Sequence, residues 1–253
     1  MKVSIITVCY NSGKTLEQTI ESVAAQDYPE IEHIIVDGGS KDNSLAIIEK
    51  NSNLIAKWIS EPDRGMYDAM NKGIALATGD VIGILNSDDV YLYPQAISDL
   101  MSAMQNAKAD AVYADLVLVD QHDHSKVLRY YDSSYFHPRK FKYGWMPAHP
   151  TFFVKKKVYD EVGPFAIDYQ IAADYEMLIR ILAVQQTPYV YVPKAVVQMR
   201  SGGASTASLM RNWVLNQEIV RACKDNGIYS NMAMLLPKIP LKLWGAIKGR
   251  LQH

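Results

Sequence analysis

The 253-residue sequence has few cysteines and almost no net charge, and each feature excludes some classes of protein. The two cysteines, Cys9 and Cys223, are too few for a disulfide framework and lack the spacing of a metal site. Lysine and arginine number 26, and aspartate and glutamate number 27, so the formal net charge is −1. A chain without an excess of basic residues is not expected to bind nucleic acid.

Long apolar segments are also missing. No run of about 18 apolar residues is present, so no membrane-spanning helix is predicted. The first residues, MKVSIITVCYNS, lack the apolar core and the small-residue cleavage site of a signal peptide. Together with the low cysteine content, these features lead us to expect a cytoplasmic protein.

One glycine is missing from a motif that the first predicted strand otherwise suggests. The stretch VCYNSGKT (8–15) follows an apolar run and precedes a helical pattern, which is the outline of a phosphate-binding loop. That loop requires a glycine five residues before the Gly of Gly-Lys-Thr, and Val8 occupies this position. A β-branched residue cannot adopt the backbone conformations that glycine supplies there. The sequence therefore excludes P-loop ATPase or kinase chemistry at this strand.

The first 90 residues alternate between strand and amphipathic-helix patterns. Strands are predicted over 2–10, 31–40, 55–62 and 80–89, with helices over 13–26, 44–51 and 66–79. We expect Gly79 to end the third helix in a left-handed conformation. The alternation predicts an α/β fold with a Rossmann-like, mainly parallel central sheet that is flanked by helices.

Beyond residue 110 the pattern changes. Paired strands are predicted over 109–120 and 126–131, a strand, helix and turn over 150–165, a helix over 171–184 and a strand over 188–193. The sequence from about residue 208 is helical in pattern and is interrupted by Pro237 and Pro240.

Polar and acidic residues follow each of the four N-terminal strands. Ligands bind beyond the carboxyl ends of the strands in sheets of this kind, so we expect these residues to form one site. They are Tyr10 and Asn11 after the first strand, 37–40 after the second, Asp63 and Arg64 after the third, and Asp88 and Asp89 after the fourth.

Two of these strand ends carry specific chemistry. The adjacent carboxylates of Asp88 and Asp89 suit Mg²⁺ or Mn²⁺ with positions left for phosphate oxygens, although a helix cap is the alternative. Asp37 can accept hydrogen bonds from a base or a ribose, although a tight turn followed by a helix cap explains it equally well. The G-x-G-x-x-G fingerprint is absent after both of the first two strands, which disfavours NAD.

Three ordered stretches resemble the inverting family 2 glycosyltransferases of the GT-A fold, of the bacterial cell-surface polysaccharide type. They are VSIITVCYNSGKTLEQTIESVAAQDYPEIEHIIVDGGSKDNS, GMYDAMNKGIALATGDVIGILNSDD, and MPAHPTFFVKKKVYDEVGPF with ADYEMLIR. The resemblance implies a GT-A domain over 1–205, with a nucleotide-binding half (1–110) and a smaller acceptor half (111–205). A helical C-terminal extension then covers 206–253.

The resemblance also implies an activity. It is the metal-dependent transfer of a hexosyl group from a nucleoside-diphosphate sugar, with UDP favoured and GDP as the alternative. The receiving group is a hydroxyl of a glycan or a lipid-linked acceptor in cell-surface polysaccharide synthesis. Mn²⁺ or Mg²⁺ is the implied cofactor.

Roles for individual residues follow from the resemblance. Nucleotide-binding residues are Thr7, Tyr10, Asn11, Asp37, Asp63, Asn71, Lys72 and Asp88. Asp89 is the implied metal ligand. Asp174 is the implied general base, in a segment where family members often have Glu-Asp and this chain has Ala173-Asp174; Glu176 is the next candidate and a helix cap the alternative role of Asp174. Arg200 and His149 are implied contacts of the diphosphate or the acceptor, beside the alternatives of a flexible connector and a structural histidine.

The C-terminal tail interleaves apolar residues, including Trp244, with Lys238, Lys242, Lys248 and Arg250. Such a segment suits peripheral contact with the cytoplasmic face of the inner membrane, and packing of the tail on the domain is the alternative. Two other functions compete with the glycosyltransferase interpretation. A sugar nucleotidyltransferase should carry a glycine-rich, arginine-containing loop after the first strand, and CYNSGKT is neither. A non-catalytic nucleotide-sugar-binding module is disfavoured by the presence of Asp174.

Overall fold

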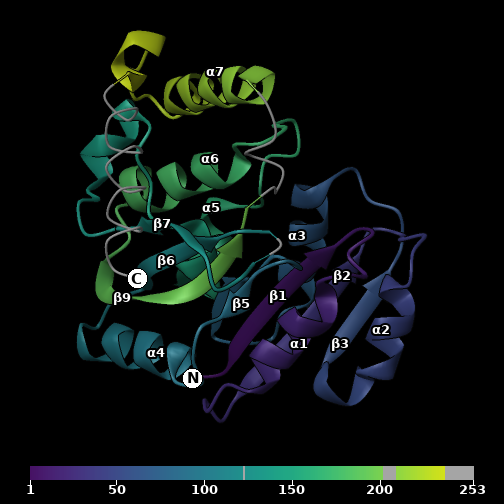
Figure 1. Cartoon of the computed structure of the whole chain (residues 1–253). Coiled ribbons are helices and arrows are strands. Elements are labelled where there is room, and N and C mark those ends of the chain that lie inside the picture. The colour runs from purple at the N-terminus through teal and green to yellow at the C-terminus, as the bar shows by residue number, and fades with distance from the viewer. Residues whose placement is uncertain (122, 202–208, 237–253) are drawn as a thin grey trace.

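The computed structural model describes residues 1–121, 123–201 and 209–236 as an α/β fold around one sheet (Figure 1). The first half contains β1 (Val3–Cys9), α1 (Leu16–Ala24), β2 (Ile31–Asp37), α2 (Ser44–Lys50), β3 (Lys57–Ser60), α3 (Met66–Leu76), β4 (Val81–Ile84), β5 (Val90–Tyr91) and α4 (Ala96–Asn106). The second half contains β6 (Ala111–Val119), β7 (Val127–Tyr131), β8 (Phe153–Lys155), α5 (Lys156–Val162), α6 (Ala173–Ile179), β9 (Tyr189–Arg200) and α7 (Leu209–Asp225). Short helical turns cover Ser52–Leu54, Pro138–Tyr143, His149–Thr151 and Met232–Leu235, and a π-helix covers Arg180–Val184.

The sheet has the strand order β3-β2-β1-β4-β8-β6-β9-β5, with β7 paired to β6. The strands β3, β2, β1 and β4 are mutually parallel, whereas β8 runs antiparallel to both β4 and β6. Parallel register aligns Cys9 with Asp37 and Asp37 with Ser60, so the carboxyl ends of the first three strands lie side by side. The predicted α/β fold is confirmed, and the sheet is parallel across β3, β2, β1 and β4 and mixed beyond them.

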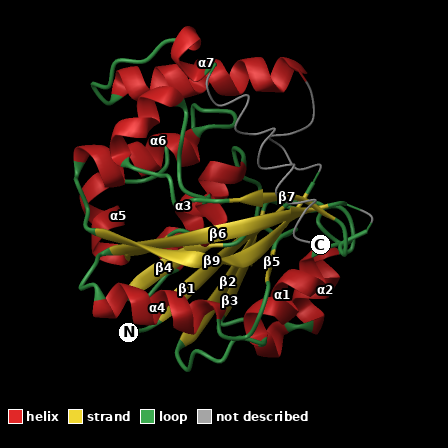
Figure 2. Cartoon of the chain, turned by 60° about the vertical axis from the view of Figure 1, so that its left-hand side comes forward, coloured by secondary structure: helices red, strands yellow, loops and turns green. Residues whose placement is uncertain are grey.

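Helices cover both faces of the sheet, with α1, α2 and α4 on one side and α3, α5, α6 and α7 on the other (Figure 2). All seven residues of β1 are buried, as expected for a parallel strand between two helical layers. Alternate residues face opposite layers, because Ile6 and Val8 pack with α3 while Cys9 packs with α1 and α2. The two layers hold the carboxyl ends of β1 and β2 in fixed positions.

The prediction for Gly79 is wrong. Helix α3 ends at Leu76, and Gly79 does not have a positive φ. A Cβ atom on Gly79 would lie 2.7 Å from the backbone nitrogen of Ser4 and 2.9 Å from the carbonyl oxygen of Lys2. Glycine is needed there because the chain passes close to β1, not because a helix ends.

Two parts of the second half differ from the sequence prediction. Strand β9 continues to Arg200 although the predicted strand ends at Pro193. A register shift opposite Ala114 and Asp115 accommodates the proline, because a bulge leaves extra residues unpaired. Helix α4 and the short strand β5 were not predicted; they pack against β9 and close the sheet's second edge.

Helix α7 lies within the predicted C-terminal extension and packs on α6 (Figure 1). Residues 202–208 and 237–253 lie outside the described residues, and so does the predicted membrane contact of the C-terminal tail. Within the described residues, no helix has the length and apolar character needed to cross a membrane.

Candidate active site

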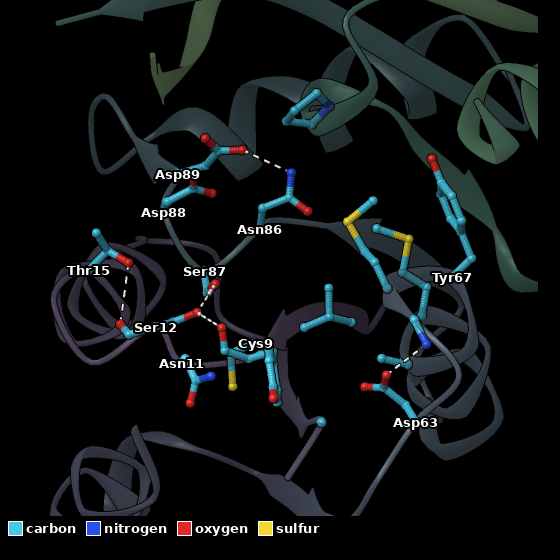
Figure 3. A pocket seen from close by; sticks show the side chains of 18 of the residues that line it. Cys9, Asn11, Ser12, Thr15, Asp63, Tyr67, Asn86, Ser87, Asp88 and Asp89 are labelled. Atoms are coloured by element: carbon cyan, nitrogen blue, oxygen red, sulfur yellow. Dashed lines mark hydrogen bonds between the residues drawn. The ribbon is translucent and has the colours of Figure 1, made fainter. Parts of the chain in front are cut away.

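A cavity of about 1190 Å³ opens at the carboxyl ends of β1, β2 and β4 (Figure 3). Its walls come from the loops after these strands, from the start of α3, and from the segments 149–150 and 170–174 of the second half. Both halves of the chain therefore contribute to one site. Eight predicted site residues line it: Tyr10, Asn11, Asp63, Asp88, Asp89, His149, Asp174 and Arg200.

Four other predicted nucleotide-binding residues do not line the cavity: Thr7, Asp37, Asn71 and Lys72. The hydroxyl of Thr7 hydrogen-bonds Nε2 of His33 at 3.0 Å inside the sheet. Asn71 bridges to the second half, because its side chain donates to the carbonyl of Phe165 and accepts from the N–H of Phe165. Lys72 donates to the carbonyl of Pro62. Their part in nucleotide binding stays a prediction.

Asp37 organises the loop after β2. Its fully buried carboxylate accepts hydrogen bonds from the N–H groups of Gly39 and Ser40 and from the hydroxyls of Ser40 and Ser60. Burial alone would raise the pKa of Asp37, but the hydrogen bonds from Ser40 and Ser60 outweigh it and lower the pKa. Asp37 is therefore an ionised anchor of the cavity wall.

The loop after β1 is tied to the loops after β2 and β4. Asn11 has a φ of 51°, and its side chain accepts the N–H of Lys41 at 2.8 Å. The hydroxyls of Ser12 and Ser87 are hydrogen-bonded at 2.8 Å (Figure 3). These contacts give the cavity a floor of three interlocked loops, which suits a site formed before its ligand arrives.

Asp63 brings the loop after β3 against the loop after β2. A Cβ on Gly38 would lie 2.3 Å from Oδ2 of Asp63, so only glycine permits this approach. The other oxygen of Asp63 accepts the N–H of Gly65 at 2.8 Å.

Asp88 and Asp89 form an acidic pair across the cavity from Tyr67 (Figure 3). Burial raises the pKa of Asp89 well above its usual value, and the neighbouring charge of Asp88 adds to the rise. Burial also raises the pKa of Asp88, with the charge of Arg200 acting in the opposite direction. Two desolvated carboxylates side by side hold an excess of negative charge that a cation would neutralise.

The pair fits a divalent cation. Within the described residues, Oδ1 of Asp89 is buried without a hydrogen-bond partner, and Oδ2 accepts a 3.3 Å hydrogen bond from the side chain of Asn86. Among the residues that the structure describes, no group of three or more His, Cys, Asp and Glu side chains could hold a metal ion. Protein ligands from this pair would therefore leave coordination positions for oxygens of a ligand.

Asp174 reaches the cavity from the first turn of α6. Its carboxylate accepts the N–H of the next residue, Tyr175, at 2.8 Å, and the cap position of α6 is occupied by Ala172 and not by Asp174. Burial raises the pKa of Asp174, and His149 and the hydroxyl of Tyr67 reduce that rise. A desolvated carboxylate with a raised pKa suits proton abstraction.

Glu176 lies outside the cavity lining. It forms an ion pair with Arg180 at 2.8 Å, and Arg180 in turn donates to the carbonyl oxygens of Val162, Gly163 and Pro164. Glu176 therefore anchors α6 to the loop after α5, and Asp174 remains the candidate base.

Several lining residues were not predicted as site residues. Lys14 and Lys41 are cationic residues that line the cavity. Both lysines stand directly beside the strand ends that were predicted to bind the ligand, in SGK and GSK. Their position next to those turns is the sequence feature that could have identified them as candidate ligand-binding residues.

The chain is similar in sequence to known glycosyltransferases. The family model for glycosyl transferase family 2 matches residues 4–163. A glycosyltransferase of Mycobacterium tuberculosis, Rv1514c, is 34% identical over 184 residues, which cover 72% of this chain and 69% of the relative. A PGL/p-HBAD biosynthesis glycosyltransferase of Mycobacterium bovis is 28% identical over 185 residues, or 70% of this chain and 68% of the relative.

Two solved structures share the fold. Staphylococcus aureus TarS (residues 1–349) in complex with UDP-GlcNAc superposes with a TM-score of 0.68 at 19% identity, covering 93% of this chain and 70% of that one. The mannosyltransferase PcManGT of Pyrobaculum calidifontis, in complex with GDP-Man and Mn²⁺, gives a TM-score of 0.64 at 19% identity over 88% of this chain and 63% of that one.

Proposed function

The chain belongs to glycosyl transferase family 2, and we propose that it transfers a hexosyl group with inversion from a nucleoside-diphosphate sugar to an acceptor hydroxyl. One observation carries the proposal: a single cavity joins the Asp88–Asp89 pair of the first half to Asp174 of the second. An acid pair suited to a metal–diphosphate and a separate carboxylate suited to a proton are the minimum set for such a transfer. Family membership also disfavours the sugar nucleotidyltransferase alternative.

The reaction exchanges one bond for another. The oxygen of the acceptor hydroxyl forms a bond to the anomeric carbon, while the bond from that carbon to the diphosphate oxygen breaks and its electron pair leaves with the nucleoside diphosphate. The hydroxyl proton passes to the carboxylate of Asp174, which must be ionised beforehand. Attack on the face opposite the leaving group inverts the anomeric configuration.

The first half supplies the donor site. Asp89 would hold Mn²⁺ or Mg²⁺, with Asp88 beside it as a nucleotide contact, and the cation would offset the negative charge of the departing diphosphate. Lys14, Lys41 and Arg200 lie around the same cavity and can pair with phosphate oxygens. The exposed ring of Tyr10 is available to stack on a base.

The base of the donor is proposed from similarity alone. TarS binds UDP-GlcNAc and PcManGT binds GDP-Man. We favour UDP because UDP-sugars are common donors in glycosyl transferase family 2. The acceptor is proposed to be a glycan or a lipid-linked glycan of cell-surface polysaccharide synthesis, reached from the cytoplasmic face of the membrane. His149 and Asp174 form the wall that such an acceptor would meet.

A thermal-shift panel tests the proposal. UDP, GDP, CDP and dTDP are added with and without Mn²⁺ to the wild type and to Asp89→Ala. We expect one nucleotide to raise the melting temperature of the wild type only when Mn²⁺ is present, and the variant to lose that rise. No stabilisation by any nucleotide would overturn the proposed activity. Turnover of the matching sugar donor, followed as released nucleoside diphosphate, then measures catalysis.

A further inference from the structure

Helix α7 contacts every residue of the segment that leads into α6, residues 168–172, which we call the pre-α6 segment. At its start, Asp168 forms an ion pair with Arg221, and the hydroxyl of Tyr169 donates to the carboxylate of Asp225 at 2.9 Å. The next three residues donate their backbone N–H groups to Glu218. These hydrogen bonds measure 2.6 Å for residue 170, and 2.9 Å for both 171 and 172.

Glu218 is suited to hold this segment rigidly. Its side chain is 8% exposed, and a buried carboxylate is stable only when its oxygens accept strong hydrogen bonds. The residue before α6 is Ala172, which has no side-chain group to cap the helix. Glu218 accepts from the N–H groups that lead into α6, although it lies 46 positions further along the chain than Ala172.

The opposite side of the same segment faces the cavity. Gln170 and Ile171 line it, and the hydroxyl of Tyr67 donates to the carbonyl oxygen of Ile171. Asp174 follows two residues after Ala172, in the first turn of α6. The pre-α6 segment is therefore fixed between α7 and α3, and its position determines where the carboxylate of Asp174 lies.

We propose that Glu218 is a positioning residue for the transfer reaction: by holding the pre-α6 segment it places the carboxylate of Asp174 against the acceptor hydroxyl. The inference rests on the proposed function, because it takes Asp174 as the group that receives the proton. Glu218 itself does not line the cavity. Helix α7, which the sequence assigns to a C-terminal extension, then forms part of the framework of the active site.

The variant Glu218→Gln tests the proposal with little change in volume. The amide replaces one acceptor oxygen by an NH₂ group that faces a backbone N–H, so part of the cluster is lost. We expect faster hydrogen–deuterium exchange at amides 170–172, and a decrease of at least about tenfold in kcat, because displacing a reacting group by about 1 Å costs up to about 100-fold. The donor KM should stay within about twofold, because Glu218 hydrogen-bonds the pre-α6 segment and does not itself line the cavity.

The matched control is Asp225→Asn, the same chemical change two turns further along α7. Asp225 meets the pre-α6 segment through the Tyr169 side chain and not through the backbone, so we expect kcat to remain within about threefold of the wild type. Glu218→Asp keeps the charge on a shorter side chain and should recover part of the lost kcat. Melting temperatures identify any variant whose fold is lost.

A second set of variants separates positioning from general destabilisation. If Glu218 acts through Asp174, adding Glu218→Gln to Asp174→Asn should cause no further loss of kcat. A further loss in the double variant, an unchanged kcat in Glu218→Gln, or unchanged exchange at 170–172 would each overturn the proposal. Full turnover by Asp174→Asn would instead refute the proposed base, and with it the positioning role. Absence of nucleotide binding by the wild type would refute the proposed function, and the exchange data would still report whether Glu218 holds the segment.

Discussion

The hydroxyl of Tyr67 on α3 donates a hydrogen bond to the carbonyl oxygen of Ile171, which lies 104 residues further along the chain. This contact joins the first half of the fold to the segment that carries Asp174. Tyr67 is 4% exposed, whereas Ile171 is half-buried and lines the cavity, so water can reach the carbonyl oxygen once the hydroxyl is removed.

Tyr67→Phe should therefore weaken both stability and catalysis. Loss of the hydroxyl removes a hydrogen bond to a partly buried carbonyl, which should lower the free energy of unfolding by about 0.5–1.5 kcal/mol. We also expect a several-fold decrease in kcat, because the pre-α6 segment loses its hydrogen bond to α3 and keeps only its contacts with α7. Urea denaturation and steady-state kinetics measure the two effects. An unchanged unfolding midpoint would contradict the assigned role.

The pH dependence of turnover should report the raised pKa of Asp174. A base acts only when ionised, so kcat/KM should fall as the pH decreases through that pKa, at a higher pH than for an exposed aspartate. His149 and Tyr67 are the side chains that reduce the rise in pKa. Burial lowers the pKa of His149 itself, so its charge acts on Asp174 only at acidic pH, where the acidic limb lies; in His149→Gln the limb should therefore move to higher pH. A limb that stays in place, or moves to lower pH, would contradict this electrostatic assignment.

Asp89→Asn should separate stability from function. Burial raises the pKa of Asp89 well above its usual value, which means that the ionised form is unfavourable in the metal-free fold. Removing the charge should raise the melting temperature without metal and abolish stabilisation by Mn²⁺ with a nucleoside diphosphate. Differential scanning calorimetry with and without Mn²⁺ measures both. A lower melting temperature in metal-free buffer would show that the carboxylate stabilises the fold.

His33 should make the fold sensitive to mild acid. Burial lowers its pKa from 6.5 to about 4, so the neutral form is favoured in the fold while the unfolded chain binds a proton below pH 6.5. Stability should therefore decrease as the pH falls from about 6.5 toward 4, by about 2 kcal/mol at pH 5 relative to pH 7.5. His33→Gln should lose this part of the pH dependence in urea denaturation. Equal pH dependence in both proteins would refute the assignment.

The sequence predicts the first half of the fold well because its signals are local. Strands β1 and β2 are short apolar runs that end in turn residues, and α1 has apolar residues at helical spacing. The site follows from the same information, since strand direction alone brings Asn11, Asp63 and Asp88 to one edge. These three residues line one cavity, as the strand directions predict. Their roles in binding stay predictions.

Other features depend on contacts that leave no local pattern. The continuation of β9 past Pro193 requires a bulge against β6, whereas a proline alone indicates the end of a strand. The family resemblance implies a nucleotide contact for Asn71, and no local pattern signals that its amide also pairs with the backbone of Phe165, 94 residues away. The hydrogen bonds of Glu218 to residues 170–172 are equally distant in sequence, so only the folded chain reveals them.

The antiparallel strand β8 has a mechanical consequence. It is hydrogen-bonded to β4 of the predicted donor half (1–110) on one side and to β6 of the predicted acceptor half (111–205) on the other. The halves therefore share one continuous ladder and cannot rotate as two hinged lobes without breaking it. Any change in the shape of the cavity must therefore come from loops and helices that lie on the sheet, and not from bending between the two halves.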